Sequence, residues 1–436
     1  MRKSKIYSIR DLEVFKNKLL IWAKQFGRIA YFDSNNVLNS NKSKYEYSKY
    51  KTIAAIGCIK EIVANQNCFD DFEHFSNSIN DWLFGYFSYD LKNEVESLNS
   101  KNLDRLKFPE LHFFQPQYVF CFLKNKVEIL FYNQNLNEKN IDVIFQAIET
   151  TEIRTTVSKN EVVIKKRISK KEYIEIIEKL QQHIKRGDIY EANFCQEFFA
   201  KNAEINPYFL FSILKKISPT PFSCFYKFDD KFLISASPER YLKKIEDKII
   251  SQPIKGTIKR GKNPKDDNLL IKKLKNDPKE RAENIMIVDL VRNDLSRTAC
   301  KNTVKVEELC GIYSFAQVHH MISTVVSKLQ KKYSYIDPIK YSFPMGSMTG
   351  APKIRAMELI EQYEKTKRSL YSGAVGYISP SKDFDFNVVI RSFLYNESEK
   401  YLSFQVGSAI TDKSLPEKEY EECLLKAEAM IKSLNK

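Results

Sequence analysis

The chain has 436 residues, of which 43% are hydrophobic, and is long enough for a sizeable folded core. Lys and Arg number 70 against 55 Asp and Glu, a formal net charge of +15, but they are spread along the whole chain among the acidic residues, which favours a solvated surface over a nucleic-acid face. We therefore expect no nucleic-acid partner. No uninterrupted apolar stretch of about 18 residues occurs, so we do not expect the chain to span a membrane.

Residues 1–155 are predicted to form an amino-terminal region of mixed helices and strands. Its clearest element is a hairpin, in which Tyr118–Leu123 and residues 127–132 flank a short polar tip. His74 and His112 stand alone and are more typical of surface or core histidines than of metal ligands. No chemistry is visible in this region, and we expect it to pack into the same fold as the rest of the chain.

The second region is predicted to span residues 160–434. A helix begins after Ser169, which forms a capping box with Glu172, and it ends at Gly187. Strands are predicted over 189–199, 232–235, 240–245, 249–254, 373–378, 387–394 and 401–406. With no internal repeat or low-complexity linker, the pattern predicts an α+β fold of large, mainly antiparallel sheets packed in layers, with helices outside.

The helix that begins at Pro278 is apolar on nearly every side, which predicts that it is buried. It also carries Glu283, and a buried carboxylate is unfavourable unless a cation or hydrogen-bond donors compensate it. Arg281 or Arg292 on the same helix could be that partner, and a metal ion is the alternative.

The last helix adds carboxylates of its own. Glu419, Glu422 and Lys426 fall at positions i, i+3 and i+7, so they line one face. Two carboxylates aimed in one direction favour a divalent cation, and oxygen ligands suit Mg²⁺. No His or Cys cluster has the spacing of a zinc site. The pattern therefore predicts Mg²⁺.

Two short segments rich in small residues offer further chemistry. The loop at 346–353 runs into a helix, a pattern in which backbone N–H groups can converge on an anion. In the segment 253–257, Lys255 precedes Gly256, which would let a ligand approach closely. A surface lysine is the default interpretation. In an apolar pocket near other cations, Lys255 could instead lose its proton and become a nucleophile.

Several motifs follow one another in order along residues 169–434: Gly187-Asp188-Ile189-Tyr190, Ser237-Pro238-Glu239-Arg240, Pro253-Ile254-Lys255-Gly256-Thr257, Arg281-Ala282-Glu283-Asn284, His319-His320-Met321, the loop at 346–353, and Glu419-Tyr420-Glu421-Glu422. Together they resemble the chorismate-binding enzyme family, which includes anthranilate synthase component I, aminodeoxychorismate synthase component I, and the isochorismate and salicylate synthases.

The resemblance implies a metal site and an acid. Glu283 and Glu422 would hold Mg²⁺, with Glu419 nearby and acting through water, and the metal would bind the ring carboxylate of chorismate. Glu239 would be the general acid that protonates the departing C4 hydroxyl. His320 would lie beside that leaving group.

The resemblance also implies a set of substrate-binding residues: Gly256, Thr257, Ser347, Tyr377, Arg391 and Gly407. The last three, Gly407 through its backbone, would hold the enolpyruvyl carboxylate of chorismate. An arginine suits that task because its planar guanidinium pairs with a carboxylate at two points.

Within the family, Lys255 favours the aminodeoxychorismate synthases that use covalent catalysis, since anthranilate and isochorismate enzymes usually have Ala there. By this resemblance Lys255 attacks ring C2 and expels the C4 hydroxyl; ammonia then adds at C4 and expels Lys255, giving 4-amino-4-deoxychorismate. Anthranilate synthase component I is the alternative. Glu191 stands where the aminating enzymes commonly have Gln, and its added charge near a dianionic substrate predicts that it is paired with a Lys or protonated.

The source of the ammonia is expected to lie outside this chain, which has no Cys and His pair at glutaminase signatures. A partner glutamine amidotransferase is therefore implied, or free ammonia in its absence. The eight cysteines lie far apart, with no Cys-x-x-Cys pair, which predicts reduced thiols and a cytoplasmic location.

Overall fold

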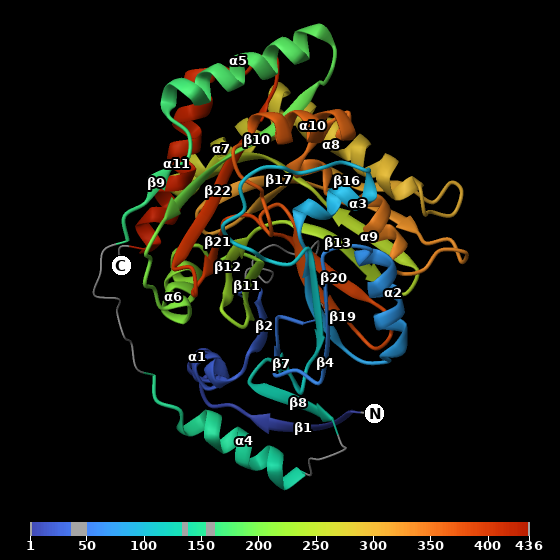
Figure 1. The fold of residues 1–436 in the computed structure, drawn as a ribbon, viewed down its shortest axis with the longest axis vertical. Coiled ribbons are helices and arrows are strands. Elements are labelled where there is room, and N and C mark those ends of the chain that lie inside the picture. The colour runs from blue at the N-terminus through green and yellow to red at the C-terminus, as the bar shows by residue number, and fades with distance from the viewer. Residues whose placement is uncertain (1, 36–49, 133–137, 154–161, 435–436) are drawn as a thin grey trace.

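The computed structural model describes residues 2–35, 50–132, 138–153 and 162–434 (Figure 1). Its strands form two large antiparallel sheets, called sheet A and sheet B below, which share one hydrophobic core, and helices lie outside them. The predicted α+β class, with layered antiparallel sheets and helices outside, is confirmed.

Sheet A has 12 strands among the described residues. In spatial order they are β1 (Arg2–Ser8), β8 (Lys126–Tyr132), β7 (Tyr118–Leu123), β3 (Thr52–Ile56), β2 (Arg28–Asp33), β11 (Phe222–Phe228), β12 (Lys231–Ser237), β21 (Ser392–Asn396), β22 (Tyr401–Ile410), β10 (Glu191–Ala200) and β18 (Gly350–Ala351), with β9 (Lys165–Lys166) also paired to β10.

Sheet B has 10 strands in the same described ranges. In order they are β15 (Ile254–Lys259), β17 (Val318–Lys328), β14 (Lys248–Gln252), β13 (Arg240–Ile245), β20 (Phe384–Val388), β19 (Ala374–Ile378), β5 (Leu83–Phe87), β6 (Leu111–Gln115) and β4 (Lys60–Ala64), with β16 (Lys305–Ser314) also paired to β17. Residues 1–155 thus supply strands to both sheets. The predicted boundary between the two regions falls within 154–161, outside the described residues.

The helices are α1 (Leu12–Trp22), α2 (Cys68–Ser78), α3 (Lys92–Val95), α4 (Glu138–Thr150), α5 (Lys170–Arg186), α6 (Pro207–Ile217), α7 (Pro264–Asn276), α8 (Pro278–Ser296), α9 (Asp337–Ser342), α10 (Lys353–Tyr363) and α11 (Pro416–Leu434), with short 3₁₀ helices at Ala23–Gln25, Tyr89–Leu91 and Gly346–Met348. None of those described is both long and apolar enough to cross a membrane.

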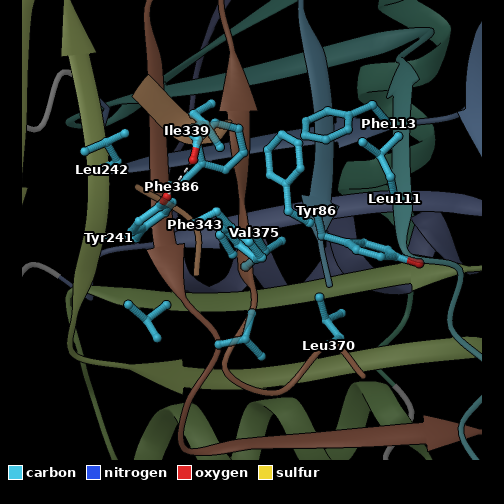
Figure 2. Packing of buried hydrophobic residues seen from close by; sticks show 14 of the residues in the cluster. Tyr86, Leu111, Phe113, Tyr241, Leu242, Ile339, Phe343, Leu370, Val375 and Phe386 are labelled. Atoms are coloured by element: carbon cyan, nitrogen blue, oxygen red, sulfur yellow. Dashed lines mark hydrogen bonds between the residues drawn. The ribbon is translucent and has the colours of Figure 1, made fainter. Parts of the chain in front are cut away.

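Two hydrophobic clusters hold the layers together. One joins the facing sides of the two sheets and extends under α2, α8 and α9. Figure 2 shows part of it, where Phe113 of β6 meets Phe386 of β20 at 6.1 Å between ring centroids. The other fills the space between sheet A and the helices α1, α4, α5, α6, α10 and α11. All eight cysteines are free thiols, as predicted.

Local sequence signals set several of these boundaries. The side chain of Ser169 accepts a hydrogen bond from the Glu172 N–H at the start of α5, and Gly187 ends that helix with a φ of 88°. Asp277 caps α8 in the same way, immediately before Pro278. These predicted starts and stops are confirmed, as is the hairpin of β7 and β8.

Two predicted strands are wrong as single elements. The segment 387–394 ends β20 in sheet B and begins β21 in sheet A, with residues 389–391 crossing between the sheets. The segment 249–254 divides into β14 and the start of β15. The pattern of apolar residues could not reveal the sheet crossing, because the segment is extended and mostly buried on both sides of it.

The prediction that α8 is buried all round is also wrong. Ile287, Val291 and Leu295 face the core, but Ile285 is 39% exposed and Asp289 lies on the surface. The helix packs against β15 and β17 through one face, so its other face is free to present side chains.

Candidate active site

The chain passes from one sheet to the other at two adjacent places. Residues 237–240 connect β12 to β13, and residues 388–392 connect β20 to β21. The Ala236 N–H donates a hydrogen bond to the Arg391 carbonyl, and the Val388 N–H donates to the Glu239 carbonyl, each at 3.1 Å. These bonds hold the Glu239 and Arg391 backbones beside each other. Arg391 has a φ of 51°, a left-handed conformation that is uncommon for a large side chain and is often found at functional sites.

Glu239 is a buried carboxyl group whose pKa lies near neutral pH. Its side chain is buried, and the Ser347 hydroxyl donates a hydrogen bond of 2.7 Å to Glu239 Oε1. Burial raises the pKa of Glu239 to about 7, although Ser347 and the charge of Lys255 act in the opposite direction. A carboxyl with such a pKa can hold a proton near neutral pH and give it to a leaving group.

Lys255 forms an ion pair that bridges the two sheets. Its Nζ, on β15, lies 2.8 Å from Oε1 of Glu191 on β10, and the two side chains are 11% and 1% exposed. Burial acts to lower the pKa of Lys255, but the charges of Glu191, Glu283 and Glu239 raise it above its usual value. The default interpretation as a surface lysine is therefore wrong, and the alternative of a pocket with other cations is not what the structure shows either, because the charged groups around Lys255 are carboxylates that favour its ammonium form. The prediction that Glu191 is paired with a Lys is confirmed.

His320 lies on β17, next to Thr257 of β15. Its Nδ1 is 2.7 Å from the Thr257 hydroxyl oxygen, and its buried Nε2 has no hydrogen-bond partner in the described structure. Burial and the nearby charge of Arg391 lower the pKa of His320 well below its usual value, so the ring is neutral. His320 and Arg391 also line the same hollow.

Gly256 lies between Lys255 and Thr257 and has a φ of 94°. A Cβ there would approach Oε2 of Glu280 on α8 to 3.0 Å and Cβ of Met321 to 3.1 Å. A glycine therefore suits both the backbone conformation and the close packing of β15 against α8.

The three residues predicted for the enolpyruvyl carboxylate lie in different surroundings. Within the described ranges, no side-chain hydrogen bond or ion pair engages the Arg391 guanidinium, whose pKa burial lowers. Gly407 pairs with Cys195 across β22 and β10, and a Cβ there would lie 2.3 Å from the Cys195 sulfur. Tyr377 packs instead against Trp82, at 5.8 Å between ring centroids, and no hydrogen bond in the described part of the chain joins it to Arg391 or Gly407.

Tyr371 is a candidate that the sequence analysis missed. Its side chain is buried, and its hydroxyl is 3.9 Å from the sulfur of Cys195, the residue opposite Gly407. Tyr371 lies in the turn before β19, outside every motif. The signal available in the sequence was a large aromatic residue two positions before Gly373.

The predicted metal ligands gather around Lys279, in the first turn of α8. Burial acts to lower the pKa of Lys279, and the charges of Glu283, Glu419, Glu280 and Glu422 raise it above its usual value. Carboxylates from both α8 and α11 therefore act on the charge of this one lysine. Glu283 lies 3.7 Å from Lys279 Nζ.

Two further pairs on these helices are local. Glu422 lies 2.7 Å from Lys426, and Arg292 pairs with the exposed Asp289 at 2.7 Å. The Arg281 guanidinium donates a hydrogen bond to the Lys275 carbonyl. The alternative in which Arg281 or Arg292 compensates Glu283 is therefore wrong.

The acidic cluster suits Mg²⁺ in donor type and charge. Burial raises the pKa of Glu283 to about 7, aided by the charges of Glu191 and Glu280 and opposed by Lys255 and Lys279. Such a carboxyl gains from a nearby dication, and carboxylate oxygens are the donors that Mg²⁺ prefers. In the described ranges, however, no three His, Cys, Asp or Glu side chains are grouped closely enough to hold a metal. The Mg²⁺ site stays a prediction.

The loop at 346–353 positions Ser347. It begins with the 3₁₀ turn Gly346–Met348 and continues into β18, which pairs with the start of β10 opposite Glu191. A Cβ on Gly346 would lie 2.4 Å from Cδ2 of Leu290, so the loop packs directly on α8. Lys353 forms a buried ion pair of 2.7 Å with Asp294. The predicted anion site in this loop stays a prediction.

The family relationships of the chain agree with this site. Residues 20–432 match the family described as chorismate binding enzyme. Anthranilate synthase component 1 of Aquifex aeolicus is 33% identical over 369 residues, which cover 81% of this chain and 74% of that protein. Aminodeoxychorismate synthase component 1 of Bacillus subtilis is 31% identical over 360 residues, or 80% and 76% of the two chains. The crystal structure of anthranilate synthase component I from Streptococcus pneumoniae has a TM-score of 0.77 and 25% identity over 90% of this chain and 93% of that one. The chain belongs to the chorismate binding enzyme family.

Proposed function

We propose that this chain is component I of an aminodeoxychorismate synthase, which aminates chorismate at C4 to give 4-amino-4-deoxychorismate for 4-aminobenzoate and folate synthesis. The observation that carries the proposal is the buried amine of Lys255, which lies 2.8 Å from Glu191 Oε1 and near enough to the buried carboxyl of Glu239 for the charge of each to affect the pKa of the other. A nucleophile and an acid in one pocket are what replacement of a ring hydroxyl requires.

The proposed reaction has two steps. Once Lys255 has given up a proton, its amine attacks C2 while Glu239 gives its own proton to the C4 hydroxyl, which leaves as water; Lys255 regains its proton after it is released. Ammonia then adds at C4, the C2–N bond breaks, and its electron pair returns to the Lys255 nitrogen. The ammonium group formed at C4 returns a proton to Glu239. Chorismate and ammonia are consumed, and 4-amino-4-deoxychorismate and water are formed.

The other site residues bind and orient chorismate in this proposal. Arg391, whose guanidinium is without a side-chain partner in the described ranges, pairs with the enolpyruvyl carboxylate at two points. The neutral ring of His320 stands beside the C4 hydroxyl. Glu283 and Glu422, with Glu419 behind a water molecule, would hold Mg²⁺, whose charge neutralises the ring carboxylate and draws electron density from the ring.

A separate glutamine amidotransferase supplies the ammonia in this proposal. The relatives from Aquifex aeolicus and Bacillus subtilis are each named as component 1 of their enzymes, which supports a division of labour between two subunits. The cytoplasmic location stays a prediction.

Anthranilate synthase component I is a second candidate, favoured by the 33% identity to the Aquifex aeolicus protein of that name. The two are separated by incubating the purified chain with chorismate, Mg²⁺ and an ammonium salt and identifying the product by mass spectrometry. We expect 4-amino-4-deoxychorismate. Formation of anthranilate and pyruvate would assign the chain to the second candidate.

A further inference from the structure

Glu191 has an oxygen that its ion pair does not explain. Oε1 accepts the hydrogen bond from Lys255 at 2.8 Å, but Oε2 is buried and has no hydrogen-bond partner in the described structure. A buried carboxylate oxygen without a donor is unfavourable. A proton on the Glu191 carboxyl group would remove the negative charge that this oxygen shares.

The surroundings of Lys255 leave few groups that could take its proton. Glu239 must keep its own proton for the leaving hydroxyl under the proposed function, and it already accepts a hydrogen bond from Ser347. Glu283 lies next to a second ammonium, that of Lys279. The titratable groups that face Lys255 are Glu191 from β10, Glu239 from the crossing between β12 and β13, and Glu280 and Glu283 from α8.

We propose that Glu191 is a catalytic base that accepts the Lys255 proton as the amine attacks chorismate, an inference that rests on the proposed function. An N–H bond of the ammonium breaks, its electron pair stays on the nitrogen, and the proton forms an O–H bond on Glu191. The ion pair becomes a neutral pair with no change in total charge. The proton returns to Lys255 when the amine is released from C2.

This transfer gives the enzyme a characteristic pH dependence. Because the proton moves within the pair, the attack does not require its loss to solution, and the amine can react below the pH at which Lys255 would titrate. Without a base beside it, only the fraction of Lys255 that is already neutral can attack, and that fraction falls about tenfold for each pH unit below its pKa.

The kinetic test compares Glu191→Gln and Glu191→Asp with the unchanged chain, using kcat/KM for chorismate at saturating ammonia between pH 6 and pH 8.5, a range of about two and a half units. For Glu191→Gln, the loss relative to the unchanged chain should grow as the pH falls, by up to about tenfold per unit. Glu191→Asp should be slower but keep the original pH profile. A loss with Glu191→Gln that is equal at every pH would show a merely structural role and overturn the proposal.

A second measurement does not depend on turnover. Acetic anhydride labels neutral amines, and mass spectrometry of the Lys255 peptide against pH reports the pKa of that amine. Loss of the carboxylate in Glu191→Gln should shift the labelling curve to lower pH, whereas Glu191→Asp should shift it less. Coincident curves for Glu191→Gln and the unchanged chain would overturn the inference while leaving the proposed function standing. A shifted curve for Glu191→Gln together with no aminated product from the unchanged chain would instead remove the proposed function.

Discussion

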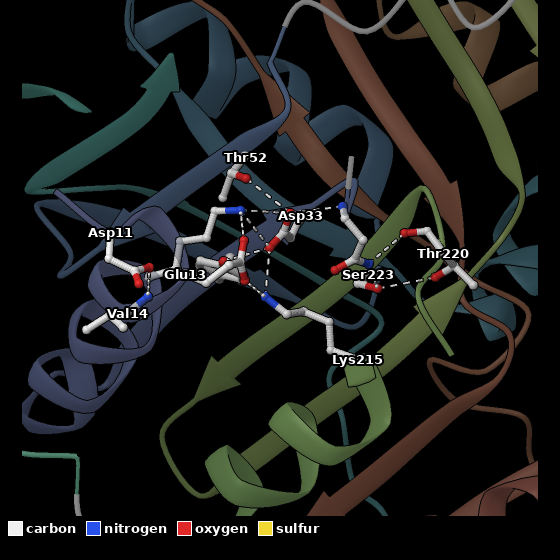
Figure 3. Close-up of polar contacts among 11 residues, drawn as sticks. Asp11, Glu13, Val14, Asp33, Thr52, Lys215, Thr220 and Ser223 are labelled. Carbon is white, nitrogen blue, oxygen red and sulfur yellow. Dashed lines mark hydrogen bonds and ion pairs between the residues drawn. The ribbon is translucent and has the colours of Figure 1, made fainter. Parts of the chain in front are cut away.

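Two buried clusters of lysines and carboxylates, one around Asp33 and one around Lys255, differ in how completely their polar groups are paired. Around Asp33 of β2, Lys215 and Lys16 lie 2.9 and 3.2 Å from Asp33 Oδ2, and the Thr52 hydroxyl donates to Oδ1 (Figure 3). The Tyr31 hydroxyl donates to Oδ2. Burial opposes ionisation, but the two lysines lower the pKa of Asp33 to about 2. Every oxygen of that carboxylate has a partner.

The pocket around Lys255 uses the same residue types with the opposite balance. One ammonium faces several acids, Glu191 Oε2 has no partner in the described structure, and burial raises the pKa of Glu239 to about 7. Charges that are mutually satisfied stabilise the fold. Groups left short of partners oppose it, but they are ready to exchange protons or bind ions. The contrast separates a structural cluster from a candidate catalytic one.

The largest effect should come from removing a lysine from each cluster. Lys255→Ala should lower amination of chorismate by about 10³-fold or more, equivalent to ~4 kcal/mol, because the attacking amine is lost. Chorismate binding, measured by calorimetry, should remain. The matched variant Lys16→Ala should keep its activity and lose stability instead. Equal turnover in Lys255→Ala and the unchanged chain would remove Lys255 from the mechanism.

Removing the acid of the structural cluster should have the next largest effect. Asp33→Ala leaves Lys16 and Lys215 without their shared buried partner, and we expect a loss of about 3 kcal/mol in the free energy of unfolding, measured in urea. The exposed Asp229, which pairs with Arg28, is the control, and its replacement by Ala should change stability by less than ~1 kcal/mol.

The acid side of the stability curve provides a signature for Asp33. Its folded pKa of about 2 lies below the usual value of 3.8, so its contribution to stability is present above about pH 4 and is lost as the pH falls toward 2. The unchanged chain should therefore lose about 2 kcal/mol in this window that Asp33→Ala does not lose. If stability falls equally with pH in the unchanged chain and in Asp33→Ala, the lysines do not lower the pKa of Asp33.

Sequence alone predicted the features that depend on residues close together in the chain. The cap at Ser169, the stop at Gly187 and the start of α8 depend on neighbours within four residues. The family motifs also singled out Glu239 and Lys255 as candidates. What could not be predicted is the environment of Lys255, because its partner Glu191 is 64 residues away and on the other sheet.

The same limit explains the errors in secondary structure and partners. The break of strand 387–394 at Arg391 depends on where sheet A meets sheet B, which no short pattern encodes. The sequence offered Arg281 or Arg292 as partners for Glu283, but the ammonium that lies near it is that of Lys279, four residues earlier in α8. Burial of α8 was overestimated because an apolar helix can still leave one face on the surface.

Glu239→Gln should reverse the usual effect of mutation on stability. The pKa of Glu239 is raised from 4.5 to about 7 by burial, so its favourable contribution is complete below about pH 4.5 and is lost as the pH rises through 7. At pH 8 the neutral amide should make the variant more stable than the unchanged chain by about 3 kcal/mol, and at pH 4 the two should be alike. Amination should fall by about 100-fold or more, because the acid is gone. A variant less stable at both pH values would contradict this assignment.

The smallest effect tests how finely Glu239 is adjusted. The Ser347 hydroxyl donates to Glu239 Oε1 at 2.7 Å, and this bond lowers the pKa of the carboxyl against the effect of burial. Ser347→Ala should therefore move the alkaline limb of kcat/KM to higher pH and change the rate by less than about tenfold. Ser251 is the matched control, since it lines the same hollow but donates to the Tyr241 carbonyl. If Ser251→Ala moves the limb equally, the shift reflects general loosening of the pocket. A shift confined to Ser347→Ala would mean that two opposing influences, burial and one hydroxyl, keep the pKa of Glu239 near neutral pH. The pKa of Asp33 in the structural cluster is instead held low by two lysines, so loss of a single hydroxyl there should matter less.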